Sequence, residues 1–232
     1  MSVLVIQNYL DSGLGQIEPL LIEAGFSIDL RHAYQGEALP RDDSDYQAMI
    51  VLGGEQNALA DGACPYFPHL LNLIRAFGDK DKAVLGICLG SQLVARAYGG
   101  ENILDRPMEF GWHEVRLTDD GKSDPVLAEA GLSFPIFHWH RDTFSLPEGA
   151  THLAVSDMTV HQAYRIGRAV YGTQFHFEAN SELVVEWSES LGDSITAFAP
   201  EWPAQLPANL QRSGIAADKA GAALAKAWID LI

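Results

Sequence analysis

A cysteine flanked by glycines is the first feature of this sequence that could do chemistry. Gly86, Cys88 and Gly90 alternate where the apolar run 83–87 meets a segment with helical spacing. This is the setting of a nucleophile elbow, in which small neighbours let strand and helix pass close together. The N-terminal end of such a helix stabilises a thiolate and offers N–H groups to an oxyanion. The pattern predicts a nucleophilic Cys88, with an inert core cysteine as the alternative interpretation.

A thiol nucleophile needs a base, and one of the eight histidines has a suitable partner. Polar and aromatic residues alternate at the strand period over 174–178, which places His176 and Glu178 on one face. The interleaved Phe175 and Phe177 would then enter the core. A carboxylate beside an imidazole fixes its tautomer and stabilises the imidazolium. We therefore predict a catalytic unit of the thiol, His176 and Glu178, against the alternative of a solvated pair on an edge strand.

The elements that must position these residues alternate between strands and helices. Short β-branched or apolar runs, each ended by polar residues or glycine, predict the strands, and residues at helical spacing predict the helices between them. In the middle of the chain, strand-like segments follow one another with few helices between them. We expect an open, mostly parallel α/β sheet flanked by helices, flavodoxin-like, with an antiparallel strand addition in the middle of the chain. The expected strands are 3–6, 26–30, 48–52, 83–87, 112–117, 134–139, 152–155, 163–166 and 170–177, and the helices 14–24, 66–77, 89–98 and 181–191.

The C-terminal part of the chain is rich in proline and then in alanine. We expect a Pro-rich connector over 200–207 and a helix from about Asn209 onward, in a segment too short to fold alone. We therefore expect 1–232 to form a single domain. Trp187, Trp202 and Trp228 fit either a dimer interface or the core, and we favour the core.

Charge and composition exclude several classes of protein. The chain has 31 acidic and 15 basic side chains among 232 residues, a net charge of −16, which leaves no basic stripe for nucleic acid. No apolar run approaches the roughly 20 residues of a membrane helix, and the short apolar N-terminus lacks the features of a signal peptide. Two cysteines suit a reducing compartment, so we expect a cytoplasmic protein. Cys64, in a loop before proline, is interpreted as structural or incidental.

Taken together, the elbow and the later H-x-E run resemble the class I glutamine amidotransferases. That family carries a Cys-His-Glu triad on a G-x-C-x-G-x-Q elbow and an H-x-E strand, matched here by Gly86 through Gln92 and by His176 and Glu178. More narrowly, the chain resembles the stand-alone proteins related to the glutaminase domain of GMP synthetase. The resemblance runs from the first strand to about Leu191 and leaves the C-terminal segment uncovered.

The resemblance also implies an oxyanion hole. Gly53 and Gly54 match the glycine turn whose backbone N–H acts together with the amide after the nucleophile, here that of Leu89. Two positions depart from the family pattern. Family members commonly have proline where this chain has Glu55, which could place a charge at the pocket mouth, and proline where it has Phe177. Neither departure removes a catalytic atom.

Substrate contacts follow from the resemblance in the same way. Gln92 matches a position that contacts glutamine. The segment 138–144 matches a pocket-lining segment in which His140 and Asp142 are candidate substrate contacts, with Asp142 facing the α-ammonium group. The alternative interpretation of that segment is a structural strand face whose polar side chains form their hydrogen bonds within the protein. The segment 109–112 resembles another family segment near the site.

The reaction implied is release of ammonia from the glutamine side chain, or cleavage of a γ-glutamyl amide, through a thioester on Cys88. Neither a cofactor nor a metal is expected. Because no phosphate-binding loop of the G-x-x-x-x-G-K-[ST] type occurs, ammonia would pass to a separate synthetase subunit. The alternatives are a γ-glutamyl peptidase or hydrolase without such a partner, and a catalytically quiet subunit with a binding or regulatory role. The α/β-hydrolase type is disfavoured because its acid residue precedes the histidine.

Overall fold

A nine-stranded mixed sheet with the order β2-β1-β3-β4-β11-β10-β9-β6-β7 forms the centre of the molecule. The computed structural model describes Met1–Ile232. Its first five strands are parallel, in the flavodoxin-like order. They are β1 (Ser2–Gln7), β2 (Ser27–His32), β3 (Ala48–Val51), β4 (Ala83–Ile87) and β11 (Val170–Thr173).

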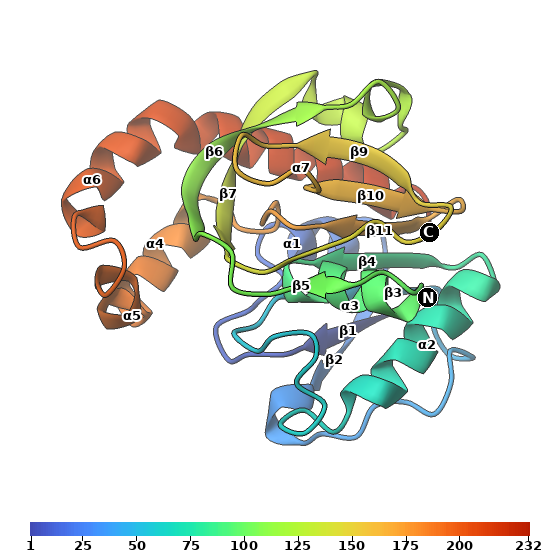
Figure 1. The fold of residues 1–232 in the computed structure, drawn as a ribbon. Helices are drawn as coiled ribbons and strands as arrows, with labels where there is room; N and C mark the ends of the chain where they lie inside the picture. The colour runs from blue at the N-terminus through green and yellow to red at the C-terminus, as the bar shows by residue number, and fades with distance from the viewer.

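Helices cover both faces of this parallel half, because its central strands are apolar on both sides. In β1, Val3 and Val5 belong to the core cluster on one face, whereas Leu4 and Ile6 belong to the cluster on the other. The first cluster includes residues of α1 (Ile17–Glu23) and α7 (Ile215–Ile229), and the second includes residues of α2 (Phe67–Asp79) and α3 (Leu89–Ala97). Figure 1 shows the helices on the two sides of the sheet.

The other four strands are antiparallel and come from the middle of the chain. A separate two-stranded ladder joins β5 to β8 beside them. The fold class is therefore confirmed, including the antiparallel addition. The bounds are β5 (Asn102–Ile103), β6 (Glu109–Leu117), β7 (Ser133–His140), β8 (Thr143–Phe144), β9 (Thr151–Val155) and β10 (Ala163–Ile166), with short 3-10 turns at Ala33–Gln35, Gly121–Ser123 and Leu127–Ala130.

The strand expected over 170–177 ends earlier than we predicted, at Thr173. Beyond it, the N–H of Gln174 donates to the carbonyl of Gln162 at 2.8 Å, and the N–H of His176 donates to the carbonyl of Phe137 at 2.8 Å. The chain thus leaves the regular ladder and reaches β7 through an isolated bridge. His176 and Glu178 lie in this irregular segment rather than on a strand.

The C-terminal helices also begin earlier than we predicted. The segment interpreted as a Pro-rich connector is helical from Trp202, because Pro203 lies in the first turn, where backbone N–H groups have no intrahelical acceptor. Trp187, Trp202 and Trp228 are all buried, as expected for core residues. In Figure 1, α4, α5 and α6 lie to one side of the sheet. These helices are α4 (Ser181–Ser190), α5 (Gly192–Thr196) and α6 (Trp202–Asn209), and a π-helical turn, Leu210–Gly214, joins α6 to α7.

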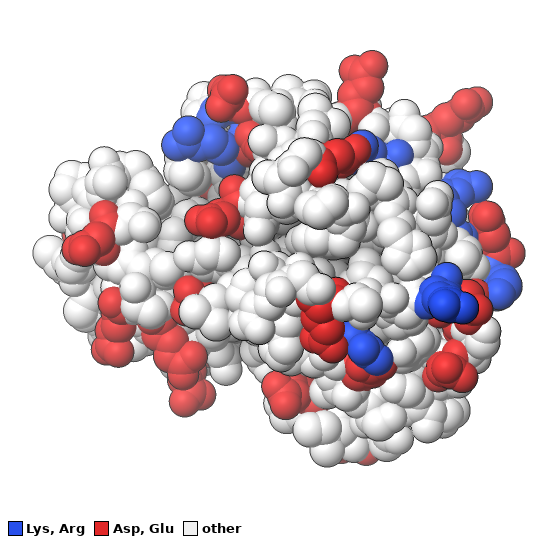
Figure 2. All heavy atoms as spheres, turned by 90° about the horizontal axis from the view of Figure 1, so that it is seen from below, with Lys and Arg blue, Asp and Glu red and all other residues white.

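None of these helices combines the length and the apolar character that crossing a membrane requires. On the face shown in Figure 2, acidic side chains are more widespread than basic ones, which reflects the net charge of −16. Both cysteines are free thiols.

Candidate active site

Cys88 occupies a strained turn between β4 and α3. Its φ of 52° and ψ of −110° lie in a region that non-glycine residues rarely adopt. The two flanking glycines are sterically required. A Cβ on Gly86 would lie 2.5 Å from the carbonyl oxygen of Gly90, and one on Gly90 would lie 1.9 Å from the carbonyl oxygen of Val51. The N–H of Cys88 donates to the carbonyl of Thr173 at 2.8 Å, so the elbow is fixed to the end of β11.

His176 and Glu178 form a buried pair beside this elbow. The Nδ1 atom of His176 lies 2.6 Å from Oε1 of Glu178. The ring of His176 also packs edge-on against Trp187, with centroids 5.4 Å apart. The loop before α1 holds the backbone of the pair, because Gln16 donates its N–H to the Glu178 carbonyl at 3.0 Å and its Nε2 to the Phe177 carbonyl at 2.6 Å.

The charges around His176 favour its protonated form. Burial alone would lower the pKa of this imidazole, but the negative charges of Glu178 and Cys88 outweigh burial and raise the pKa well above 6.5. The Oε2 atom of Glu178 is buried without a hydrogen-bond partner, so its charge is directed mainly at the ring. An imidazolium facing a thiolate is the arrangement that cysteine hydrolases use.

Gly53 lies next to both Cys88 and His176. A Cβ there would be 3.2 Å from Cε1 of His176 and 3.6 Å from Cβ of Cys88, so a side chain would separate the two. A Cβ on Gly54 would be 2.9 Å from Cδ2 of Leu89, so Gly54 lies against the Leu89 side chain. Leu89 is the first residue of α3, and its N–H therefore has no acceptor within the helix. The assignment of these amides to an oxyanion hole stays a prediction.

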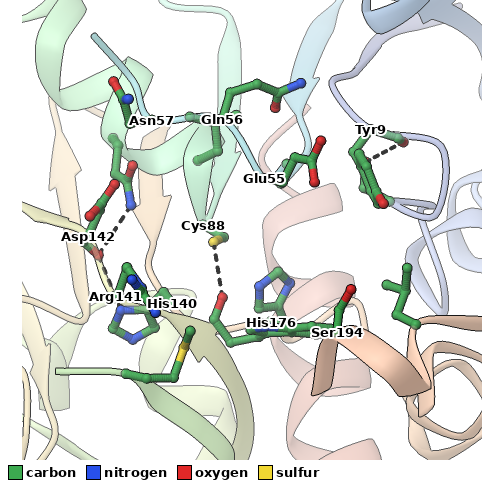
Figure 3. Close-up of a pocket in the computed structure, with 18 of the residues that line it drawn as sticks. Tyr9, Glu55, Gln56, Asn57, Cys88, His140, Arg141, Asp142, His176 and Ser194 are labelled. Atoms are coloured by element: carbon green, nitrogen blue, oxygen red, sulfur yellow. Dashed lines mark hydrogen bonds between the residues drawn. The ribbon is translucent and has the colours of Figure 1, made fainter. Parts of the chain in front are cut away.

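A cavity of about 470 Å³ opens above the thiol and contains every sequence-predicted site residue except Glu178. Figure 3 shows Cys88 near the centre of the view, with Asp142, Arg141 and His140 to one side and His176 with Ser194 to the other. Glu55 and Tyr9 lie on the His176 side.

Gln92 and Asp142 line this cavity and are connected to each other. The Nε2 atom of Gln92 donates to the carbonyl of Asp142 at 3.3 Å and to Oε1 of Gln174 at 3.2 Å. The carboxylate of Asp142 accepts the N–H of Asp105 at 2.9 Å. Both side chains are thus held in place before any substrate binds.

His140 forms part of the wall, and both of its ring nitrogens face protein atoms. Nδ1 is 3.2 Å from the carbonyl oxygen of Asp142, and Nε2 is 3.2 Å from Oε2 of Glu109. Behind it, Nδ1 of His138 is 3.7 Å from Oε1 of the same Glu109, and neither nitrogen of His138 has a hydrogen-bond partner. Glu109, His138 and His140 are the group whose spacing could hold a metal ion.

Sequence reasoning missed several residues of this site. Trp187 of α4 contacts His176, and Gln16, in the loop before α1, contacts the backbone of Glu178; no motif marks either position. Tyr9 and Asp11 reach the cavity from the loop after β1. Only the carboxyl-end position of β1 could have indicated them, because ligands of open α/β sheets bind outside the carboxyl ends of the strands.

The fold as a whole is similar to a solved structure. The crystal structure of a glutamine amidotransferase from Thermotoga maritima superposes with a TM-score of 0.85, at 27% identity, over 98% of each chain. The similarity therefore includes the C-terminal helices, which the motif resemblance leaves uncovered.

Several proteins are similar to this chain in sequence. The glutamine amidotransferase-like protein YfeJ of Salmonella typhimurium is 34% identical over 70% of this chain and 69% of its own length. Gamma-glutamyl peptidase 5 of Arabidopsis thaliana is 30% identical over 71% and 66%. One of the subunits of the glutamine-hydrolysing GMP synthase of Methanosarcina acetivorans is 29% identical over 78% and 88%. The family model described as glutamine amidotransferase class-I matches residues 5–184. The chain therefore belongs to the class I glutamine amidotransferase family.

Proposed function

We propose that this protein hydrolyses γ-glutamyl amides, with glutamine as the smallest member of the class, through a thioester on Cys88. The observation that carries the proposal is the placement of a strained elbow thiol and His176 in one cavity, with Glu178 beside His176 and Nδ1 and Oε1 2.6 Å apart. A nucleophile, a base and an orienting carboxylate are the groups that amide hydrolysis through a covalent intermediate requires.

In the first half of the reaction, the Cys88 thiolate attacks the γ-carbonyl carbon of the substrate. The carbonyl oxygen becomes an oxyanion and accepts hydrogen bonds from the backbone amides of Leu89 and the Gly53–Gly54 turn. The C–N bond then breaks, the leaving nitrogen takes a proton from His176, and a γ-glutamyl thioester remains on the sulfur. In the second half, His176 takes a proton from water, the resulting hydroxide attacks the thioester, and glutamate leaves as the thiolate is restored.

The glutamyl part of the substrate would lie on the side of Cys88 that carries Asp142 and Arg141 (Figure 3). There the α-ammonium group would face the Asp142 carboxylate, and the α-carboxylate would face the Arg141 guanidinium. Gln92 would contact the substrate through its side-chain amide, and His140 would shape the wall.

What becomes of the nitrogen distinguishes two versions of the proposal. The similarity to one chain of a GMP synthase favours transfer of ammonia to a separate synthetase chain. The similarity to a gamma-glutamyl peptidase favours hydrolysis without a partner. The cavity of about 470 Å³ is within the range used for drug-sized ligands and exceeds what glutamine needs, which favours a larger γ-glutamyl amide.

Replacement of the nucleophile tests the proposal directly. We expect Cys88→Ala to abolish hydrolysis of glutamine and of γ-glutamyl amides, and we expect a glutamine-like alkylating agent to label the wild type stoichiometrically at Cys88, read by mass spectrometry. Cys64→Ala is the matched control, because Cys64 is also a buried free thiol but does not line the cavity. Full activity in Cys88→Ala would overturn the proposal, and absence of activity in the wild type would favour a catalytically quiet binding protein.

A further inference from the structure

We infer that the part of the cavity on the His176 side of Cys88 is a subsite for a positively charged amine leaving group, and that Glu55 is its specificity-determining residue. The preferred substrates would be γ-glutamyl amides of diamines or polyamines. The inference rests on the proposed function, since it concerns the leaving group of that reaction.

The position of the base sets the direction of the substrate. The leaving nitrogen takes its proton from His176, so the leaving group must lie on the His176 side of the thiol. In Figure 3 that side carries Glu55, Tyr9 and Ser194. The glutamyl part then extends to the opposite side, toward Arg141, which is the only Lys or Arg among the residues that line the cavity.

The His176 side is negatively charged. Glu55 and Asp11 both line the cavity, and both lie close enough to Tyr9 to act on its ionisation. Burial, and after it the charges of Glu55 and Asp11, raise the pKa of the Tyr9 phenol. Two carboxylates and a neutral phenol can bind an ammonium group by charge and by hydrogen bonding, and the ring face adds a cation–π contribution.

Apolar side chains line the same cavity. Trp187 packs against His176, and Leu191 and Phe198 also line the cavity. A chain of methylene groups between the scissile amide and a terminal ammonium group suits a cavity that offers both apolar side chains and carboxylates. An amino-acid leaving group, as in an ordinary γ-glutamyl dipeptide, would instead bring a carboxylate toward Glu55 and Asp11.

The test uses three γ-glutamyl amides whose leaving groups each have a chain of four carbon atoms and differ in terminal charge. These are the amides of putrescine, which is cationic, of butylamine, which is neutral, and of γ-aminobutyrate, which is anionic. We expect kcat/KM to fall in that order. The putrescine-to-butylamine ratio should be roughly five- to tenfold, as expected for one charge pair at a partly exposed site, and should shrink with added salt.

Variants at Glu55 assign the preference to this residue. Glu55→Gln should reduce the putrescine-to-butylamine ratio, and Glu55→Lys should invert the preference between the cationic and the anionic amide. Glu23→Lys on α1 is the matched control, because it makes the same change in net charge at an exposed position that does not line the cavity, and it should keep the wild-type ratio. Binding of the three amides to Cys88→Ala, measured by calorimetry, should follow the same order.

The outcomes separate the two claims. Hydrolysis of all three amides at equal rates, or a preference for the anionic one, would overturn the cationic subsite and leave the proposed function standing. A wild-type preference for putrescine that Glu55→Lys does not change would overturn the role of Glu55. If neither glutamine nor any of the amides is hydrolysed, both the proposed function and this inference are overturned.

Discussion

Two buried groups of histidine and carboxylate lie near each other in this fold, and they differ in the ionisation of the histidine. In the first, His176 is 2.6 Å from Glu178, and its pKa is raised well above 6.5 although burial opposes this. In the second, His138 is 3.7 Å from Glu109, and burial lowers its pKa well below 6.5 although the carboxylate opposes this. The two imidazoles are both buried beside a carboxylate, yet their pKa values are shifted in opposite directions.

The two carboxylates, Glu109 and Glu178, differ in the groups that they contact. Glu109 accepts hydrogen bonds from Ser156 at 2.6 Å and from Gln162 at 3.0 Å, and it also faces His140 at 3.2 Å. Burial raises the pKa of Glu109, but the hydrogen bond from His140, the charge interaction with His138 and the hydrogen bond from Ser156 outweigh burial and hold the pKa at about 2. Around His138, the charge of Glu109 is opposed by burial and by the neighbouring imidazoles of His140, His113 and His176, which together lower the pKa of His138. Glu178 has His176 as its one side-chain partner, and the interaction of His176 with Cys88 adds to the effect. A short bond to a carboxylate without other partners favours the charged form of His176, whereas burial and neighbouring imidazoles favour the neutral form of His138.

The largest expected effect is on catalytic activity, and it distinguishes replacement of His176 from replacement of His138. His176→Gln should reduce kcat/KM for glutamine by roughly 10³-fold, because it removes the group that moves the proton. His138→Gln, the matched replacement in the other group, should change kcat/KM by only a few-fold. Steady-state kinetics of both purified variants measure this, and similar losses in the two would contradict the comparison.

The next effect concerns the two carboxylates and appears in the pH profile. Glu178→Gln removes the charge that raises the pKa of His176, so this pKa falls and the alkaline limb of kcat/KM moves to lower pH. Glu109→Gln should leave the alkaline limb where it is in the wild type. If the alkaline limb of the Glu178→Gln variant stays at the wild-type pH, the limb reports the ionisation of a group other than His176.

The smallest effect is on stability, and it has opposite pH windows for the two histidines. The lowered pKa of His138 means that stability is lost as pH falls below about 6.5, by about 1.4 kcal/mol per pH unit. The raised pKa of His176 means that its contribution is present below about 6.5 and is lost as pH rises through the folded-state value. Denaturant unfolding of His138→Gln should therefore lose less stability than the wild type between pH 6.5 and pH 5, whereas His176→Gln should differ from the wild type in its pH dependence above 6.5. Identical pH dependence of all three proteins would contradict both directions.

Much of the fold could be predicted from the sequence, because local signals agreed with the final packing. The run 83–87, apolar and ended by Gly-x-Cys-x-Gly, is β4 within the bounds we predicted, and the two-sided apolar pattern of β1 requires helices on both faces. The predictions failed where long-range contacts determine the backbone. Backbone N–H groups of the segment after Thr173 donate hydrogen bonds to the carbonyls of Gln162 and Phe137. No local sequence pattern predicts such contacts.

The site was predictable to a similar degree. The G-x-C-x-G and H-x-E patterns indicate Cys88 and His176, and the structure brings both into one cavity, while their catalytic roles stay predictions. The charged side of that cavity was harder to foresee. Glu55 stands out in the sequence only as a departure from a family pattern, and Tyr9 comes from a loop whose position depends on the whole sheet.

The hydrogen bond from the N–H of Cys88 to the carbonyl of Thr173 has a consequence for the way activity disappears on heating. Thr173 is the last residue of β11, and His176 follows it by three residues, so the end of β11 contacts Cys88 and also positions His176. Any partial melting that separates β4 from β11 would move Cys88 away from His176. Enzymatic activity during thermal denaturation would then report the integrity of this central strand pair, with no partly melted species that keeps a working site.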